Sequence, residues 1–132
     1  MKIIKEMDFF IPVLPVPASR PRVTQYGTYF TKNYNVFRED CKKFLKTIAK
    51  KYPTSNNLFE VHLEFICYKP KTPTNEYPRG DCDNFLKGPL DCITQSKMIW
   101  EDDVQITSLT GVKRYQDEGE PYGIKVKIIE YI

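Results

Sequence analysis

The sequence predicts a single α+β domain, residues 1–132, with a small mixed β-sheet and two main helices in the approximate order β–α–β–α–β–β. Three observations lead to this fold class. Two segments, 35–51 and 82–95, have helical periodicity, and the stretches between and after them read as strands. The chain has 132 residues, of which 41% are hydrophobic, and this suits one domain with one core.

The first third of the chain begins with a predicted strand at 7–12, MDFFIP. Prolines at positions 12, 15, 17 and 21 then exclude a helix and favour an extended course. Gly27 lies between short aromatic segments in QYGTYFT and predicts a tight turn. The helix at 35–51 follows, because apolar residues recur there at steps of three and four: Val36, Phe37, Cys41, Phe44, Leu45 and Ile48. Its other side is basic, with Lys42, Lys43, Lys46 and Lys50.

The remaining elements follow in order. Residues 58–68 alternate apolar and polar side chains and predict a strand, and the polar segment 69–80 predicts a loop. The second helix, 82–95, has Asp81 in the N-cap position, and Pro89 predicts a kink or a break within it. Two further strands, 104–115 and 122–131, are predicted to form a hairpin across QDEGEP.

Composition limits the class of protein. The longest apolar runs are far shorter than the roughly 20 residues of a membrane-spanning helix, and the start of the chain does not resemble a signal peptide. We therefore expect a soluble, cytoplasmic protein without a membrane partner. The four cysteines form no CxxC pair and His62 is the only histidine, so we expect reduced thiols rather than a structural zinc site.

Charge is distributed unevenly along the chain. The net charge is +3, but residues 1–51 carry eleven basic and four acidic groups, and residues 81–132 carry six basic and ten acidic groups. This separation indicates either a polyanion partner held near a cation site or an ordinary solvated surface.

The most informative segment is GDCDNFLKGPLDCI, residues 80–93. Asp81 and Asp83 lie two residues apart, and two such charges 4 Å apart repel by roughly 4 kcal/mol at an effective dielectric of about 20. A hard divalent cation such as Mg²⁺ would offset this repulsion, since it binds carboxylate oxygens and completes its shell with water and substrate phosphate.

Asp83, Lys87 and Asp91 have the i, i+4, i+8 spacing of one helical face. The lysine forms either a helix salt bridge with these aspartates or a contact to phosphate beside a metal. A second acidic segment, WEDDVQI, supplies Asp102 and Asp103 near the start of the next strand. Carboxylates from the two segments that converge on Mg²⁺ would suit metal-assisted phosphodiester hydrolysis.

The composite pattern resembles the RusA family of Holliday-junction resolvases. The matched residues are Asp81, Asp83, Asn84, Lys87 and Asp91, followed by Trp100, Asp102, Asp103 and Gln105. The segment PVPASRPRVTQYGTYFT also resembles an early segment of many members. The resemblance implies a RusA-like fold and a homodimeric, Mg²⁺-dependent endodeoxyribonuclease of bacterial or phage origin, with Mn²⁺ as a substitute and no organic cofactor.

The same resemblance assigns Asp81, Asp83 and Asp103 as metal ligands and adds Lys87 as the fourth catalytic residue. The implied reaction is the resolution of a four-way DNA junction by paired nicks. Basic candidates for DNA contact are Arg20, Arg22, Lys32, Lys69, Lys71 and Arg79. Tyr26, Tyr29 and Phe30 either stack on bases at an opened junction or form the core of a hairpin.

Three alternatives share most of these features. A Mg²⁺-dependent nuclease for flaps or forks would use the same catalytic residues. A module that binds branched DNA without cutting it would have no use for the acidic residues, which repel phosphate. A small interaction protein would show no dependence on Mg²⁺. His62, on the polar side of its strand, is expected at the surface or at an interface rather than in catalysis.

Overall fold

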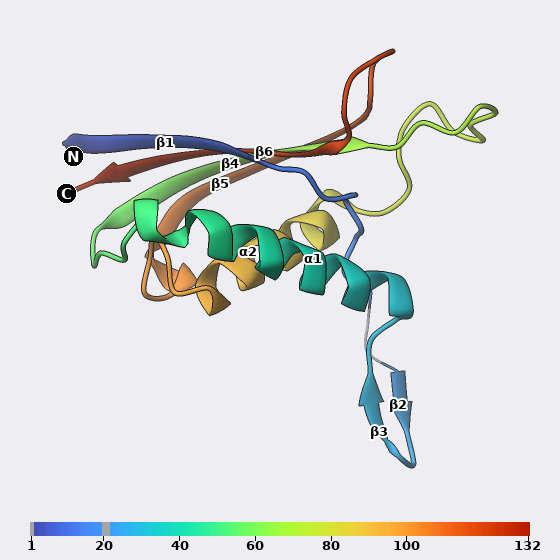
Figure 1. The fold of residues 1–132 in the computed structure, drawn as a ribbon, viewed down its shortest axis with the longest axis horizontal. Helices are drawn as coiled ribbons and strands as arrows, with labels where there is room; N and C mark the ends of the chain where they lie inside the picture. The colour runs from blue at the N-terminus through green and yellow to red at the C-terminus, as the bar shows by residue number, and fades with distance from the viewer. Residues whose placement is uncertain (1, 20–21) are drawn as a thin grey trace.

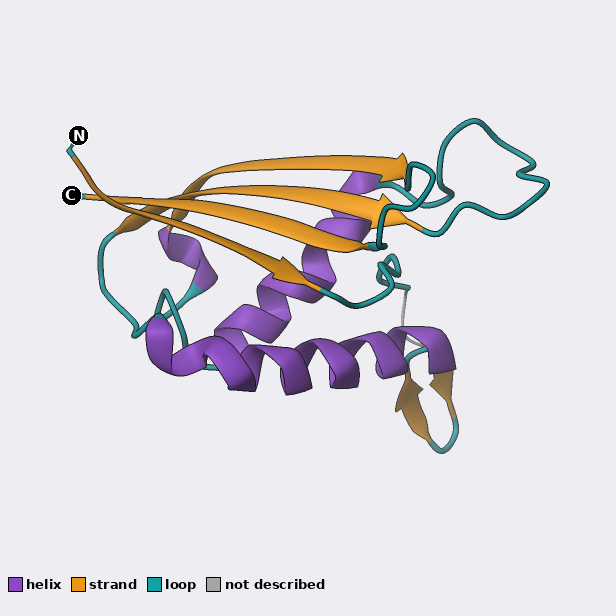
Figure 2. Ribbon diagram, turned by 45° about the horizontal axis from the view of Figure 1, so that its top comes forward, coloured by secondary structure: helices purple, strands orange, loops and turns teal. Residues whose placement is uncertain are grey.

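The computed structural model describes residues 2–19 and 22–132. It shows a four-stranded β-sheet with two helices on one of its faces, and a small hairpin that projects from the body (Figures 1 and 2). The predicted α+β class is confirmed. The elements are β1 (Ile3–Ile11), β2 (Arg22–Thr24), β3 (Gly27–Tyr29), α1 (Lys32–Ile48), β4 (Leu58–Cys67), α2 (Cys82–Gln95), β5 (Ile106–Tyr115) and β6 (Gly123–Tyr131), with 3-10 turns η1 (Ala49–Lys51) and η2 (Asp103–Gln105).

The sheet is mixed and has the strand order β1-β6-β4-β5. β4 lies inside it, antiparallel to β6 and parallel to β5. The alternation predicted for this strand is present: Val61, Leu63 and Phe65 are at most 2% exposed and belong to the core beneath the helices. Strands β1 and β5 form the two edges of the sheet.

The predicted hairpin between the last two strands is wrong. β5 and β6 do not pair with each other but flank β4 on its two sides. The physical reason is that β4 is, together with β6, one of the two strands richest in buried residues, so pairing along both edges satisfies its backbone groups where water is excluded. Residues 116–122 therefore cross the end of β4 instead of closing a tight turn.

Both helices form where the periodicity predicts them, with shifted ends. α1 begins three residues early because the Thr31 side chain caps it by accepting the Tyr34 N–H. Phe37, Cys41 and Leu45 are buried as predicted, whereas Val36 is 46% exposed and Tyr34 takes its place in the core. Among the described residues, no helix is long and apolar enough to cross a membrane.

α2 continues through Pro89 from Cys82 to Gln95, so of the two alternatives predicted at this proline, a kink or a break, the break is wrong. α2 packs closely on α1 at Gly88, where an added Cβ atom would lie only 2.6 Å from Cε1 of Phe37. The absence of a side chain at this position thus permits the approach of the two helices. The surface between their exposed edges carries the candidate site.

Candidate active site

The first turn of α2 is attached to the body on two sides. The carbonyl oxygen of Gly80 accepts a hydrogen bond from Nζ of Lys113 on β5. The carbonyl oxygen of Asn84 accepts the backbone N–H of Ala18 at 2.8 Å, which joins the proline-rich segment to the helix. Asp81 occupies the predicted N-cap position with extended backbone, but its side chain makes no capping hydrogen bond. The carboxylate is therefore left for other ligands.

A hollow of about 720 Å³ lies beside this turn, a volume typical of ligand sites. We call it the acidic hollow. α2 and its N-cap supply most of the polar lining, and the segment before α1 together with the start of α1 supplies the rest: Asp81, Asp83, Asn84, Lys87 and Asp91 on one side, and Ala18, Ser19, Phe30 and Tyr34 on the other. The structure thus brings together two of the three predicted metal ligands and the predicted catalytic lysine.

The charged groups of the acidic hollow are not neutralised by one another. Asp81, Asp83, Lys87 and Asp91 are all exposed, and none of them has an ion-pair partner within 4.0 Å in the described part of the chain. The alternative in which Lys87 only forms a helix salt bridge is therefore not what the structure shows. The lysine ammonium remains available to an anion that enters the hollow.

Asp103 lies outside α2, in the η2 turn. Gln105 fixes this turn because its side-chain amide donates to the carbonyl oxygens of Ser55 and Asn57, each at 2.8 Å. The Asp102 side chain accepts the N–H of Val104 and completes a capping box with Gln105. Asp102 and Gln105 therefore have a structural role in shaping this turn.

The carboxylate of Asp103 lines a second hollow, with Leu90 of α2 and the first residues of β5, rather than the acidic hollow. Burial raises the pKa of Asp103, and a hydrogen bond with Asp102 and the nearby charges of Asp102 and Asp91 raise it further. Asp91 lines the acidic hollow, and its charge also acts on Asp103 at the second hollow.

The three predicted metal ligands do not form one cluster within this chain. Among residues 2–19 and 22–132, no group of three or more His, Cys, Asp or Glu side chains could hold a metal ion. Asp91 follows Asp83 by two helical turns, about 12 Å along the axis, which exceeds the span of two aspartates on one ion. The role of Asp103 as a metal ligand stays a prediction.

The wall of the acidic hollow opposite α2 is aromatic, and an arginine packs on it. The Phe30 and Tyr34 rings meet edge to face with centroids 5.4 Å apart, and the guanidinium carbon of Arg38 lies 5.1 and 5.8 Å from these two centroids. Sequence reasoning missed Arg38. The i, i+4 spacing of Tyr34 and Arg38 was the available signal, since it places both side chains on one face of a helix.

In a comparison with protein-family models, the model described as endodeoxyribonuclease RusA matches residues 12–129. The chain belongs to the RusA family. Membership implies an endodeoxyribonuclease that acts on Holliday junctions. A search of curated proteins found no match to the chain.

In this RusA-family chain, the predicted DNA contacts lie on several segments. Lys32 is exposed in the first turn of α1, and Lys69, Lys71 and Arg79 are exposed in the segment between β4 and α2. Arg20 lies outside the described residues, and for Arg22 only the backbone in β2 is described. Whether these residues bind DNA stays a prediction.

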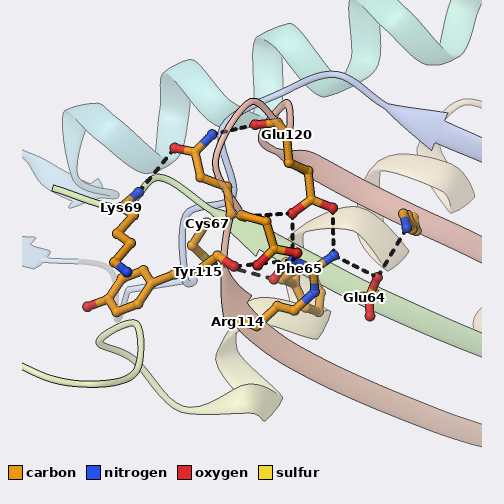
Figure 3. Close-up of polar contacts among 10 residues, drawn as sticks. Glu64, Phe65, Cys67, Lys69, Arg114, Tyr115 and Glu120 are labelled. Carbon is orange, nitrogen blue, oxygen red and sulfur yellow. Dashed lines mark hydrogen bonds and ion pairs between the residues drawn. The ribbon is translucent and has the colours of Figure 1, made fainter.

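A polar network joins the base of the 68–81 segment to the β5–β6 connection (Figure 3). The backbone N–H of Lys69 donates to the Gln116 side chain at 3.1 Å, and Gln116 donates in turn to the carbonyl oxygen of Glu120. Arg114 donates two hydrogen bonds to the Glu120 carboxylate, at 2.6 and 2.7 Å, and lies 3.5 Å from Glu64. This network fixes where the segment with Lys69 leaves the sheet.

His62 lies on β4 away from the acidic hollow. Its ring contacts the Glu60 carboxylate at 2.6 Å and the Thr110 hydroxyl of β5. The ring is 38% exposed, which agrees with the predicted surface position. These contacts place the histidine apart from the residues to which we assign the chemistry.

Proposed function

We propose that this RusA-family protein is a Mg²⁺-dependent endonuclease that resolves four-way DNA junctions by paired nicks, with the acidic hollow as its active site. The observation that supports this most strongly is the grouping of Asp81, Asp83 and Lys87 in one hollow, where none of the three has an ion-pair partner among residues 2–19 and 22–132. Exposed acidic residues repel the phosphates of DNA, so a DNA enzyme retains them where a cation intervenes.

The residues of the hollow fit Mg²⁺. This ion prefers oxygen ligands and is usually bound by one or two carboxylates, several waters and substrate phosphate, rather than by a cage of protein groups. Asp81 and Asp83 supply the two carboxylates, and Asn84, whose side chain carries an amide oxygen, lines the same hollow. When bound, Mg²⁺ supplies Lewis-acid polarisation of the phosphate and makes a water more acidic. Mn²⁺ has similar ligand preferences and would substitute.

The chain's own residues then have separate tasks. Asp81 and Asp83 hold the ion at the start of α2. Lys87, one turn further along, places its ammonium group beside the phosphate and neutralises charge that develops there during hydrolysis. The third carboxylate of the proposal, Asp103, would join only if η2 and the start of α2 approached each other or if a second subunit supplied it.

Two nicks on opposite strands require two active sites, and a homodimer provides them with matching symmetry. We therefore propose a dimer, with branched DNA as its partner. The exposed lysines and Arg79 described above would contact the phosphate backbone, so binding would weaken strongly as salt increases.

The test is cleavage of three DNA substrates of matched sequence: a four-way junction, a fork and a linear duplex. We expect symmetrical nicks in the junction with Mg²⁺, little cleavage of the linear duplex, and no cleavage by the double variant D81N/D83N. A preference for the fork would favour the alternative nuclease, and binding without cleavage by the wild type would favour the binding module. Cleavage of the linear duplex at an equal rate would contradict the junction proposal.

A further inference from the structure

Arg38 is a cation beside two aromatic residues of the acidic hollow, and no role has yet been assigned to it. Its guanidinium group lies over the rings of Phe30 and Tyr34, at 5.1 and 5.8 Å from their centroids, and both rings line the hollow. In the described part of the chain, no carboxylate lies within 4.0 Å of this guanidinium. The charge is thus held at the hollow by aromatic faces and not by an acidic partner.

One of the two rings beneath Arg38 is part of the packed core. Tyr34 is 3% exposed and stacks on Phe37 with centroids 6.2 Å apart, so its ring belongs to the core between the helices. The backbone carbonyl of Arg38 accepts a weak hydrogen bond from Sγ of Cys92 in α2 at 3.9 Å. A half-buried arginine on such a base loses little freedom when it binds a ligand.

The charges near Arg38 indicate which ligand it suits. Asp91 lines the same hollow as Tyr34 and, in the described part of the chain, forms no ion pair with Arg38. Both groups act on Tyr34, whose pKa burial and Asp91 raise and Arg38 lowers. A planar guanidinium with free N–H groups matches the geometry of a phosphate, to which it can donate two parallel hydrogen bonds.

We propose that Arg38, presented by Phe30 and Tyr34, binds a backbone phosphate of the DNA strand that enters the acidic hollow. This inference rests on the proposed function, because the ligand is the DNA of that reaction. It makes the wall formed by α1 a binding surface opposite the carboxylates of α2, so that the strand lies between a fixed cation and the metal-binding aspartates.

The experiment measures binding of a four-way junction as a function of salt in the non-cleaving D81N/D83N protein. Replacement of Arg38 by Gln removes one phosphate contact, so the slope of log K against log salt should fall by about 0.9, and affinity should fall about tenfold or less. K127A is the matched control, because Lys127 is an exposed cation on β6 among the outward side chains of the sheet. This control should leave slope and affinity unchanged.

Arg38→Lys separates the effect of the positive charge from that of the planar guanidinium geometry. It is also the variant to measure if R38Q does not fold. Lysine keeps the charge but loses the planar donor pair, so the slope should persist while affinity falls several-fold. Equal slopes and affinities for R38Q, R38K and the parent would overturn the role of Arg38 and leave the proposed function intact. Failure of the D81N/D83N parent itself to bind the junction would overturn both.

Discussion

The close approach of α1 and α2 at Gly88 predicts the effect of one added methyl group. In Gly88→Ala the new Cβ would lie 2.6 Å from Cε1 of Phe37 and 3.3 Å from Cε1 of Tyr34. Phe37 is 2% exposed and belongs to the hydrophobic core, so its ring is packed against other side chains. Overpacking of this kind costs about 1–3 kcal/mol, while alanine gains about 1 kcal/mol over glycine in a helix. We expect a net loss of about 1 kcal/mol in the free energy of unfolding.

Urea denaturation followed by the fluorescence of the only tryptophan, Trp100, measures this change. The control is the same substitution in a Phe37→Leu background, where the clashing ring atom is absent. There we expect Gly88→Ala to be neutral or stabilising by up to about 1 kcal/mol, because the propensity gain is then unopposed. An equal loss in both backgrounds, or a gain of about 1 kcal/mol in the wild type, would refute the packing argument.

Two further predictions concern polar contacts. Hydrogen bonds from Arg114, and to a smaller extent from the Asp117 backbone, lower the pKa of Glu120 from its ordinary value of 4.5 to about 2. The stabilisation by the Glu120 carboxylate is therefore present above pH 4.5 and is lost as the pH falls towards 2. The stability difference between wild type and E120Q should therefore be full at pH 7 and vanish near pH 2; a constant difference would count against the Arg114–Glu120 pair. The indole N–H of the fully buried Trp100 donates a hydrogen bond to Oγ1 of Thr94 at 2.8 Å. T94V removes the acceptor, so it should lower the free energy of unfolding by about 1–3 kcal/mol in the same urea assay. An unchanged free energy of unfolding would contradict that hydrogen bond.

The spacing of residue types along the chain predicted the structure correctly where residues close in sequence determine it. The period of Phe37, Cys41 and Leu45 located α1, and the i, i+4 spacing of Asp83 and Lys87 correctly placed them on one face of α2. Both depend only on helical geometry, which repeats within a few residues.

Features that depend on distant segments were not predictable in this way. β6 pairs with β4 instead of β5. This pairing depends on which strand lies inside the sheet, and the residues of the strands themselves do not indicate it. The position of Asp103 depends on how Gln105 docks on the segment 55–57. Phe30, Tyr34 and Arg38 face a candidate site only because α2 lies opposite α1, and that arrangement depends on the tertiary fold.

The most direct test is the rate of junction cleavage as a function of Mg²⁺ concentration for wild type, D81N/D83N and D103N. The aspartates at the start of α2 are predicted to be essential, so the wild-type rate should rise with Mg²⁺ to saturation while D81N/D83N stays inactive at every concentration, although it still binds the junction. The D103N curve shows whether the third carboxylate acts at this site. Saturating, wild-type cleavage by D81N/D83N would contradict the assignment of the acidic hollow as the active site.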